Sequence, residues 1–339
     1  MPIAPPHFTR MGEGSRPATA AWVAIGNFDG VHRGHQEVLR EAALGARAAG
    51  LPMHVLTFDP HPALALGRVP PATLTALPRK AELLLRLGVD RVLVKRFDAE
   101  FAAFSPERFA RELLAGEIGA RAVIVGRNFR FGHKRAGDLA ALEALGAALG
   151  FSVRSFDLHG DDKGAYSSTR VRDALARGDL ADANHVLARF HAFSGVVARG
   201  EARGRTIGFP TANVEETLEL VPKNGVYAVV VDRLDASEPR RPASGGSVDS
   251  GARALGRGVM NVGVRPTVAK EPRRSQEVHL FDFDGDLYGA NVRVHLVERL
   301  RDERKFASLD ELRAQIAADA DRARESTARV EPIFGGAFG

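Results

Sequence analysis

Residues 25–35 read IGNFDGVHRGH and directly follow an apolar run. The three glycines of this stretch permit a tight turn after a strand, because glycine tolerates backbone angles and close approaches that side chains forbid. A helix that begins near Gly34 would direct its free backbone N–H groups and the positive end of its dipole at an anion. His32 and His35 would add donors to a triphosphate whose charge rises as a bond to phosphorus forms. The stretch therefore predicts a strand, a phosphate-binding turn and a helix.

Two other interpretations of the histidine pair stay open. A zinc site built on His-x-x-His needs further ligands, and the chain has no cysteine and no HExxH motif. The second alternative is a purely structural pair, although two histidines in a glycine-rich turn after a buried strand are poor core material. The residue pattern favours phosphate binding over both alternatives.

The overall composition sets the number of domains and the setting. With 339 residues, of which 45% are apolar, the chain is expected to form two domains at roughly 100 to 200 residues per domain. The absence of cysteine excludes disulfides, thiolate metal sites and thiol nucleophiles, and a reducing cytoplasm is the simplest setting. No apolar run approaches the roughly 18 residues of a membrane helix, so no membrane contact is expected.

The charge balance is weakly basic, with 47 Lys and Arg against 42 Asp and Glu and a net charge of +5. No run of Lys and Arg and no basic stretch interleaved with aromatic residues marks a docking face, so a nucleic-acid partner is not expected. Anionic small molecules suit this charge equally well. A homo-oligomer is neither indicated nor excluded by the sequence.

The first half of the chain alternates short apolar runs with amphipathic ones, which predicts βαβ units around a parallel sheet over residues 21–188. Residues 1–20 are interpreted as a loosely ordered leader with at most one early strand. In the helix that begins at Pro106, Ser105 supplies the N-cap. The expected strands are 22–26, 53–58, 91–95, 122–126 and 151–156, and the expected helices are about 34–49, 78–87, 106–116 and 138–149.

After about Ala188 the sequence becomes β-rich and favours a closed or nearly closed antiparallel barrel, with a final helix opened by a capping box at Ser308, over residues 189–330. The pair Asp284-Gly285 is a strong hairpin signal. Residues 233–258 are rich in Ser, Gly, Pro and Arg and predict a flexible insertion between two strands. The expected strands are 192–198, 226–232, 259–262, 277–283 and 291–300.

The opening stretch resembles the HxGH signature of the nucleotidyltransferase superfamily. In its fuller form, GNFDGVHRGH, it resembles the FMN adenylyltransferase module of bacterial bifunctional riboflavin kinase/FAD synthetases. Further segments match that family in order: 57–62 (TFDPHP), 97–109 (FDAEFAAFSPERF), 125–132 (VGRNFRFG) and 167–172 (SSTRVR). The resemblance implies a Rossmann-like nucleotidyltransferase domain whose ATP-binding residues include Gly26, Asn27, Phe28, Asp29, His32 and His35.

The TFDPHP loop follows a predicted strand, at the end where open α/β sheets bind ligands, and its prolines restrict the backbone. The bland alternative is an ordinary Pro-rich turn. The resemblance places Asp59, Pro60, His61 and Asn128 on the FMN side. Many members of the family have aspartate where Asn128 stands, so no acid or metal-binding role is assigned to it.

The SSTRVR segment reads as a helix N-terminus that carries hydroxyl donors and cations, a combination that suits the departing pyrophosphate. The alternative is a capped surface helix with solvated arginines. The resemblance implies ATP binding by Ser167, Ser168, Arg170 and Arg172. Of the two arginines, it favours Arg172 as the one that binds ATP.

The second half carries the glycine-bearing loop 204–213 (GRTIGFPTAN). The neutral oxygens of Thr211 and Asn213 would suit a hydrated Mg²⁺ that also binds ATP phosphates, because Mg²⁺ prefers oxygen ligands and keeps several waters. A turn with side-chain capping is the structural alternative. The chain has no GxxxxGK[ST] motif, so a kinase activity here is not of the P-loop kind.

This loop resembles the signature of the bacterial riboflavin kinase module, and segments 224–227 (NGVY), 260–267 (MNVGVRPT) and 277–283 (EVHLFDF) follow in that family's order. The alternation of the last segment places Glu277 and His279 on one strand face, and the resemblance makes Glu277 the candidate general base. A solvent-facing strand acid is the alternative for Glu277. The resemblance implies metal binding by Thr211 and Asn213, and ATP or flavin binding by Gly204, Arg205, Gly208, Phe209, Pro210, Asn261, Arg265, Thr267 and Arg301.

The function expected from these resemblances is a bifunctional enzyme. It would phosphorylate riboflavin to FMN with ATP and Mg²⁺, and would then transfer AMP from a second ATP to FMN, giving FAD and pyrophosphate. The alternatives are a flavin-binding regulatory protein with only one active module and a basic nucleic-acid-binding protein.

Overall fold

The structure is a computed structural model that describes residues 8–11, 20–157, 159–199, 209–234, 251–265 and 273–331, with the backbone alone for Phe8, Arg265 and Arg273. The described residues divide into two compact units. The first unit comprises residues up to 71 and residues 77–166, and the second comprises residues 72–76 and the described residues from 167 onward. The predicted boundary near residue 188 rests on the change to β-rich sequence, and it stays a prediction.

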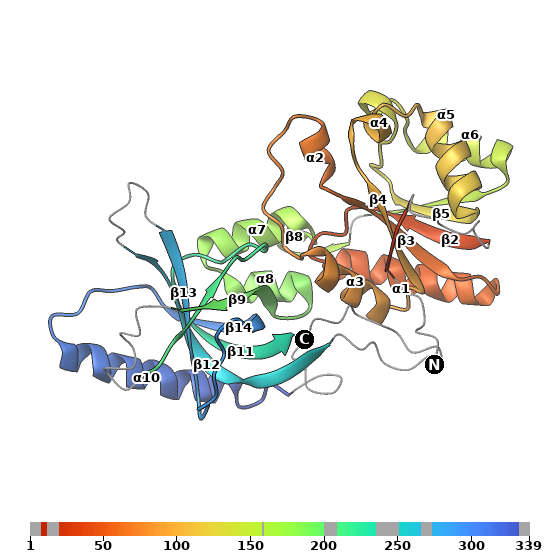
Figure 1. Cartoon of the computed structure of the whole chain (residues 1–339). Coiled ribbons are helices and arrows are strands. Elements are labelled where there is room, and N and C mark those ends of the chain that lie inside the picture. The colour runs from red at the N-terminus through yellow and green to blue at the C-terminus, as the bar shows by residue number, and fades with distance from the viewer. Residues whose placement is uncertain are drawn as a thin grey trace. The chain divides into compact units, whose positions relative to one another are not determined.

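The first unit is built on a six-stranded sheet in which every neighbouring pair is parallel, in the order β1-β4-β3-β2-β5-β6 (Figure 1). This confirms the predicted parallel sheet, with the five expected strands placed within two residues. The strands are β1 (Phe8–Arg10), β2 (Ala21–Ile25), β3 (Met53–Asp59), β4 (Arg91–Arg96), β5 (Ala120–Gly126) and β6 (Ser152–Phe156), and a small hairpin is formed by β7 (Gly160–Asp161) and β8 (Gly164–Ala165).

Helices cover both faces of this sheet because its strands are apolar on both sides. On one face, Leu39 of α1 and Leu84 of α3 pack with Val55 and Val92. On the other face, Leu114 of η1 and Leu142 of α6 pack with Val123. Ser105 caps the predicted helix, since its hydroxyl accepts from Arg108 N at 3.1 Å. The helices are α1 (Arg33–Ala48), α2 (Pro62–Ala65), α3 (Leu77–Arg86), α4 (Ala99–Ala102), α5 (Pro106–Arg108), the π-helical η1 (Phe109–Ile118), the 3₁₀ turn η2 (His133–Arg135) and α6 (Leu139–Leu149).

The strand order determines where this unit can bind a ligand. From β2 the chain passes through α1 to β3 on one side, whereas β5 and β6 lie on the other side of β2. Ligands of open α/β sheets bind outside the carboxyl ends of the strands at such a switch point. The stretch 25–35 lies at this position, directly after β2.

The second unit contains a closed antiparallel barrel with the strand order β10-β13-β12-β11-β14-β9, in which β9 pairs with β10 to complete the ring. The predicted barrel is therefore confirmed, with β10 as a strand that the sequence did not reveal. Its strands are β9 (His191–Ala198), β10 (Ala212–Glu215), β11 (Gly225–Leu234), β12 (Ala252–Arg265), β13 (Arg273–Leu280) and β14 (Asn291–Arg301).

In the described residues of the second unit, three helices accompany the barrel: α7 (Ser168–Arg177), α8 (Leu180–Leu187) and α10 (Leu309–Thr327). The predicted start of α10 is confirmed, since Ser308 Oγ accepts from Glu311 N at 3.2 Å. Ala320 and Ala323 of this helix pack on Val226 and Val259 of the barrel. No helix in the described parts of the chain is long and apolar enough to cross a membrane.

The hairpin predicted at Asp284-Gly285 is wrong. Strands β13 and β14, which flank this pair in the sequence, are not neighbours in the barrel. A two-residue type I′ turn requires positive φ at both central residues, whereas here the positive φ angles fall on Asp282 and Gly289. The segment is a longer loop that connects two separated strands.

The range predicted for the insertion, 233–258, is too wide. Arg233 and Leu234 continue β11, and they pair with Arg253 and Ala252 at the start of β12. Strand pairing satisfies the backbone of these residues even though their composition is typical of a loop. Residues 252–258 belong to β12, so only residues 235–250 of the predicted insertion lie outside the described residues.

We expect His54 to make the first unit sensitive to acid. Burial, together with the Arg91 guanidinium, lowers the pKa of His54 to about 4. Between pH 6.5 and 4 the unfolded chain then binds a proton that the folded unit does not, so stability falls as the pH falls. From pH 7 to pH 5 this residue should cost about 2 kcal/mol.

The measurement is the free energy of unfolding followed by fluorescence of Trp22, the only tryptophan, which is buried in the same unit. The variant His54→Gln should show a shallower pH dependence than the wild type, while the exposed His133→Gln should not. An unchanged pH dependence in His54→Gln would contradict this assignment.

Candidate active sites

The turn after β2 is held in an uncommon backbone conformation. Phe28 and Val31 both have positive φ, at 47° and 41°, and both side chains are buried. The Gln36 side chain donates to Val31 O at 2.8 Å and fixes the turn from within α1. Non-glycine residues seldom adopt such angles, and they are concentrated at functional sites.

His32 and His35 meet at the start of α1. His32 is the residue that precedes the helix, and its ring stacks on that of His35 with centroids 3.7 Å apart. Phe28 contacts the His35 ring edge-on at 5.1 Å, so this predicted ATP-binding residue is a buried support for the histidine. The first turn of α1 contains no acidic residue that would offset the positive end of the helix dipole. The arrangement suits an anion.

The zinc alternative finds no support in the geometry. Among the residues that the structure describes, no group of three or more His, Asp or Glu side chains is placed to hold a metal ion. A zinc site needs at least three protein ligands, and the pair His32 and His35 supplies two.

The predicted ATP turn and the predicted FMN loop come together at one edge of the sheet. Asn27 Nδ2 lies 3.3 Å from His61 Nε2, and the Thr57 hydroxyl donates to Asn27 O at 3.3 Å. His61 Nδ1 accepts from Ala63 N at 3.2 Å and so caps α2. These contacts join segments that are 30 residues apart in the sequence.

Arg10 is a residue of this edge that sequence reasoning missed. It belongs to β1, within the predicted leader, and its Nη1 lies 3.1 Å from Asp59 Oδ2. Strand β1 pairs in parallel with β4, which is about 80 residues away in the chain. Such a long-range pairing leaves no local signal in three residues of strand.

Aromatic rings lie near the carboxyl ends of β4, β3 and β5, with β2 between the last two strands. Phe58 is the last residue but one of β3 and packs edge-on against Phe97, which follows β4, at 5.5 Å. Phe129 follows β5 and stacks on Phe131 at 5.6 Å. The exposed Asn128 precedes Phe129 in the same loop. Flat ring surfaces at the carboxyl edge suit a planar aromatic ligand.

Helix α7 begins as predicted, because Ser167 Oγ accepts from Arg170 N at 3.2 Å. The arginines of this helix are not simply solvated. Arg170 forms a buried bidentate ion pair with Asp182 of α8, at 2.6 and 3.1 Å, and Arg172 Nε donates to Ala72 O at 2.7 Å. The charge of Arg170 is therefore already balanced by a carboxylate, which gives this residue a structural role in addition to the predicted one.

In the barrel, three predicted site residues lie in one row across adjacent strands. Glu277 of β13 pairs with Asn213 of β10 on one side and with Asn261 of β12 on the other. Directly paired residues present their side chains on the same face of a sheet. Asn213 is buried, with 5% of its surface exposed, whereas Glu277 is half-buried.

This row adjoins a cavity of about 630 Å³. Thr211, Asn261, Glu277 and His279 line its polar side, and Arg301 lies in its wall. Its apolar lining comes from Val226 and Val259 of the barrel strands, from Phe209 and Phe306 of two loops, and from Leu309, Leu312 and Ile316 of α10.

A second cavity, of about 320 Å³, shares Thr211 with the first. Val278 and Leu280, which alternate with Glu277 and His279 along β13, line it. The loop after β13 adds Phe283, Asp286 and Tyr288. Thr211 therefore stands where the two cavities adjoin.

The Thr211 loop is held against β13 by His279. The His279 Nδ1 atom lies 2.8 Å from Pro210 O, and Phe209 meets the same ring edge-on at 5.4 Å. Neither Phe209 nor Pro210 has a reactive group. These contacts explain why both residues nevertheless belong to the GRTIGFPTAN signature.

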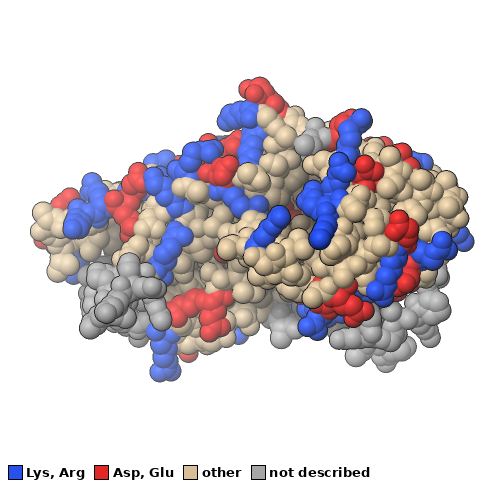
Figure 2. Space-filling view, turned by 90° about the horizontal axis from the view of Figure 1, so that it is seen from above, with Lys and Arg blue, Asp and Glu red and all other residues tan. Residues whose placement is uncertain are grey.

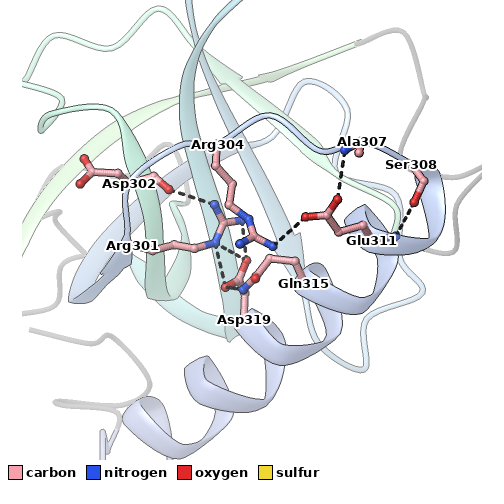
Figure 3. A network of polar contacts seen from close by, with 8 residues as sticks. All are labelled: Arg301, Asp302, Arg304, Ala307, Ser308, Glu311, Gln315 and Asp319. Atoms are coloured by element: carbon pink, nitrogen blue, oxygen red, sulfur yellow. Dashed lines mark hydrogen bonds and ion pairs between the residues drawn. The ribbon is translucent and has the colours of Figure 1, made fainter.

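Arg301 is fixed in the cavity wall by α10 (Figure 3). Its guanidinium binds Asp319 with two nitrogens, at 2.7 and 3.0 Å, and Gln315 donates to the same carboxylate at 2.9 Å. The Arg301 Nη1 atom also donates to Asp302 O at 2.9 Å. Figure 3 shows these groups converging between β14 and α10, so the planar guanidinium is held in one orientation at the cavity.

Several predicted site residues lie outside the described residues. These are Gly204, Arg205, Gly208 and Thr267, while Arg265 lies at the end of β12 with its backbone alone described.

On the face shown in Figure 2, Lys and Arg side chains are interspersed with Asp and Glu.

Comparisons with known proteins match both parts of the chain. A family model described as FAD synthetase matches residues 15–170, and one described as riboflavin kinase matches residues 187–327. The bifunctional riboflavin kinase/FMN adenylyltransferase of Escherichia coli (strain K12) is 42% identical over 317 residues, which cover 93% of this chain and 96% of that protein. The protein of the same name from Bacillus subtilis (strain 168) is 36% identical over 307 residues, which cover 89% and 90%.

A solved structure has the same fold over nearly the whole chain. A crystal structure from Streptococcus pneumoniae, described as a macrolide-efflux protein, has a TM-score of 0.78 and 30% identity, and covers 94% of this chain and 99% of that chain. That description is said of the Streptococcus protein alone.

The alternative of a regulatory protein with one active module is not favoured, because both family models match and the relatives carry both activities in their name. The two models match consecutive parts of this chain, and the two relatives cover 93% and 89% of it. The chain therefore belongs to the family of bifunctional riboflavin kinase/FMN adenylyltransferases.

Proposed function

We propose that this chain catalyses two successive steps that use ATP. In the first, the barrel domain, residues 189–330, phosphorylates riboflavin and yields FMN and ADP. In the second, the domain of residues 21–188 transfers AMP from another ATP to FMN and yields FAD and pyrophosphate. The observation that carries the proposal is the pair of cavities that adjoin at Thr211, beside the row of Asn213, Glu277 and Asn261.

The larger cavity suits riboflavin. Its apolar wall from Phe306, Leu312 and Ile316 would cover a tricyclic ring, and its polar side would meet the ribityl hydroxyls. A pocket with an apolar lining and a few convergent polar groups is the usual form of a small-molecule site. The terminal hydroxyl of the ribityl chain would then point to Thr211 and Glu277.

The smaller cavity suits the nucleotide of the kinase step. Tyr288 and Phe283 offer ring surfaces for adenine, and Leu280 and Val197 complete an apolar lining. ATP bound there would direct its γ-phosphate to Thr211, where the flavin cavity begins. Two reactants held in adjoining cavities are positioned for direct transfer.

Mg²⁺ fits the donor set at this junction. Thr211 and Asn213 are the residues that would hold it, because they place neutral oxygen donors beside the Glu277 carboxylate. The bound ion would offset negative charge on the transferred phosphoryl group. Glu277 would orient the ribityl hydroxyl and accept its proton, a modest contribution in a loose phosphoryl transfer that depends mainly on positioning.

AMP transfer is assigned to the edge of the parallel sheet. His32, His35 and the start of α1 would bind the ATP phosphates, and Ser167, Ser168 and Arg172 would stabilise the departing pyrophosphate. Asp59, Pro60, His61 and Asn128, with the neighbouring phenylalanines, would bind FMN. The cytoplasm is the proposed setting, since both steps consume ATP.

The two activities should separate by mutation. His32→Ala should lower FAD formation from FMN by about 100-fold or more, because a donor to the transition state is lost, while FMN still accumulates from riboflavin. Glu277→Gln should lower FMN formation from riboflavin by about 100-fold, while supplied FMN is still converted to FAD. Chromatography that resolves riboflavin, FMN and FAD over time measures both. Loss of both activities from either change in a folded protein would refute the two-site assignment.

The assignment of the two cavities can be tested by Michaelis constants of the kinase step. Ile316→Ala should raise KM for riboflavin by about tenfold through lost apolar burial, with KM for ATP nearly unchanged. Tyr288→Ala should raise KM for ATP by about tenfold, with KM for riboflavin nearly unchanged. Leu44→Ala, an exposed position on α1, is the matched control. If both variants raised the same KM, the cavities would be assigned wrongly.

A further inference from the structure

Lys80 lies at the ligand-binding edge of the first unit. It belongs to the first turn of α3, the helix that precedes β4 in a crossover between parallel strands. The helix of such a crossover runs antiparallel to the strands, so its first turn lies at their carboxyl edge. The turn after β2 and the loop after β3 lie at the same edge.

Two carboxylates from these two segments act on the Lys80 ammonium. They are Asp29 of the 25–35 turn, which is buried, and Asp59 of the TFDPHP loop. Burial lowers the pKa of Lys80 from its usual value, and the two carboxylates partly offset that effect. The ammonium therefore belongs to the same edge of the sheet as the proposed ATP-binding turn and the proposed flavin loop, and it interacts electrostatically with a carboxylate of each.

The other cations nearby are held differently. On the same helix, Arg79 and Arg86 both bind Glu82, at 2.6 and 2.7 Å. On β4, the Lys95 ammonium lies 3.1 Å from Glu117. For Lys80, no direct ion pair with another described residue is found within 4.0 Å. Lys80 is part-buried. A cation that is partly withdrawn from water without a direct partner costs free energy, which an anionic ligand would offset.

Arg10 strengthens this distinction. Its guanidinium contacts Asp59 at 3.1 Å and balances part of the negative charge of that carboxylate. The positive charge of Lys80 is then less fully offset by Asp59, and it remains available to a phosphate.

We propose that Lys80 binds the phosphate of FMN during AMP transfer, an inference that rests on the proposed function. In that step a phosphate oxygen of FMN attacks the α-phosphorus of ATP. The new O–P bond forms as the bond between the α-phosphorus and its bridging oxygen breaks, and the electron pair leaves with pyrophosphate. Both reactants are anionic, and an ammonium between them reduces their repulsion while it keeps its own proton.

The same contact would determine specificity. Riboflavin lacks the phosphate and gains nothing from Lys80, so the residue would favour FMN over riboflavin at this site. A buried group that is matched to a charged substrate discriminates strongly against the analogue that lacks the charge.

The test compares Lys80→Met with Lys80→Arg, and uses Lys95→Met as the matched control on the same sheet. For FAD formation from FMN, Lys80→Met should lower kcat/KM for FMN by about 100-fold or more. Its KM for ATP, and riboflavin phosphorylation, should stay within about threefold of the wild type. Lys80→Arg keeps the charge, and its kcat/KM for FMN should be at least about one tenth of the wild-type value. Lys95→Met should remain within about threefold, because the ammonium that it removes is already paired with Glu117.

A stability measurement separates binding from folding. Removal of this part-buried ammonium should leave the unfolding midpoint, followed by Trp22 fluorescence, equal to or above that of the wild type. The inference is overturned if folded Lys80→Met retains FAD formation within about threefold, or if Lys80→Arg is as inactive as Lys80→Met. If Lys80→Met is unfolded, Lys80→Arg decides between these outcomes. Failure of the wild type to convert FMN to FAD would instead refute the proposed function.

Discussion

Parallel pairing of β2 with both β3 and β5 is the constraint on which the first unit depends. It places the carboxyl ends of strands that are far apart in the sequence at one edge of the sheet. The turn that follows β2 and the loop that follows β3 then meet, as the contact of Asn27 with His61 shows. Because parallel strands need helical crossovers, the same topology also brings the first turns of α1 and α3 to this edge. Strand pairing through backbone hydrogen bonds therefore brings the segments of the site together.

Closure of the barrel has the corresponding role in the second unit. The short strand β10 bridges β9 and β13, and its pairing with β13 sets Asn213 opposite Glu277. On the other side of β13, pairing with β12 sets Asn261 opposite the same carboxylate. A shift of one residue in either pairing would turn these side chains to opposite faces. The register of three strands therefore determines whether the row of polar groups exists.

Helix α10 adds a wall that the barrel alone does not have. Its Ala320 and Ala323 pack on the barrel, whereas Leu312 and Ile316, nearer its start, line the larger cavity. The ion pair of Arg301 with Asp319 joins β14 to this helix at the same place. One part of the apolar face of this helix therefore packs on the barrel, and another part lines the larger cavity, the proposed site of a planar ring.

Sequence alone determined a large part of this protein, because local patterns carry its elements and its motifs. Apolar periodicity identified the strands of the parallel sheet, and the N-caps Ser105, Ser167 and Ser308 identified helix starts. The glycine-rich turn with His32 and His35, and the Thr211 and Glu277 segments, were recognisable because each is contiguous.

The hairpin predicted at Asp284-Gly285 was wrong because its turn signal is local, whereas strand pairing is decided by the whole barrel. Only the tertiary structure decided that Arg10 contacts Asp59, that Lys80 shares the carboxyl edge of the sheet with Asp29 and Asp59, and that two cavities adjoin at Thr211. These features depend on strand register and helix packing between distant segments, and neither leaves a signature in a short stretch of sequence.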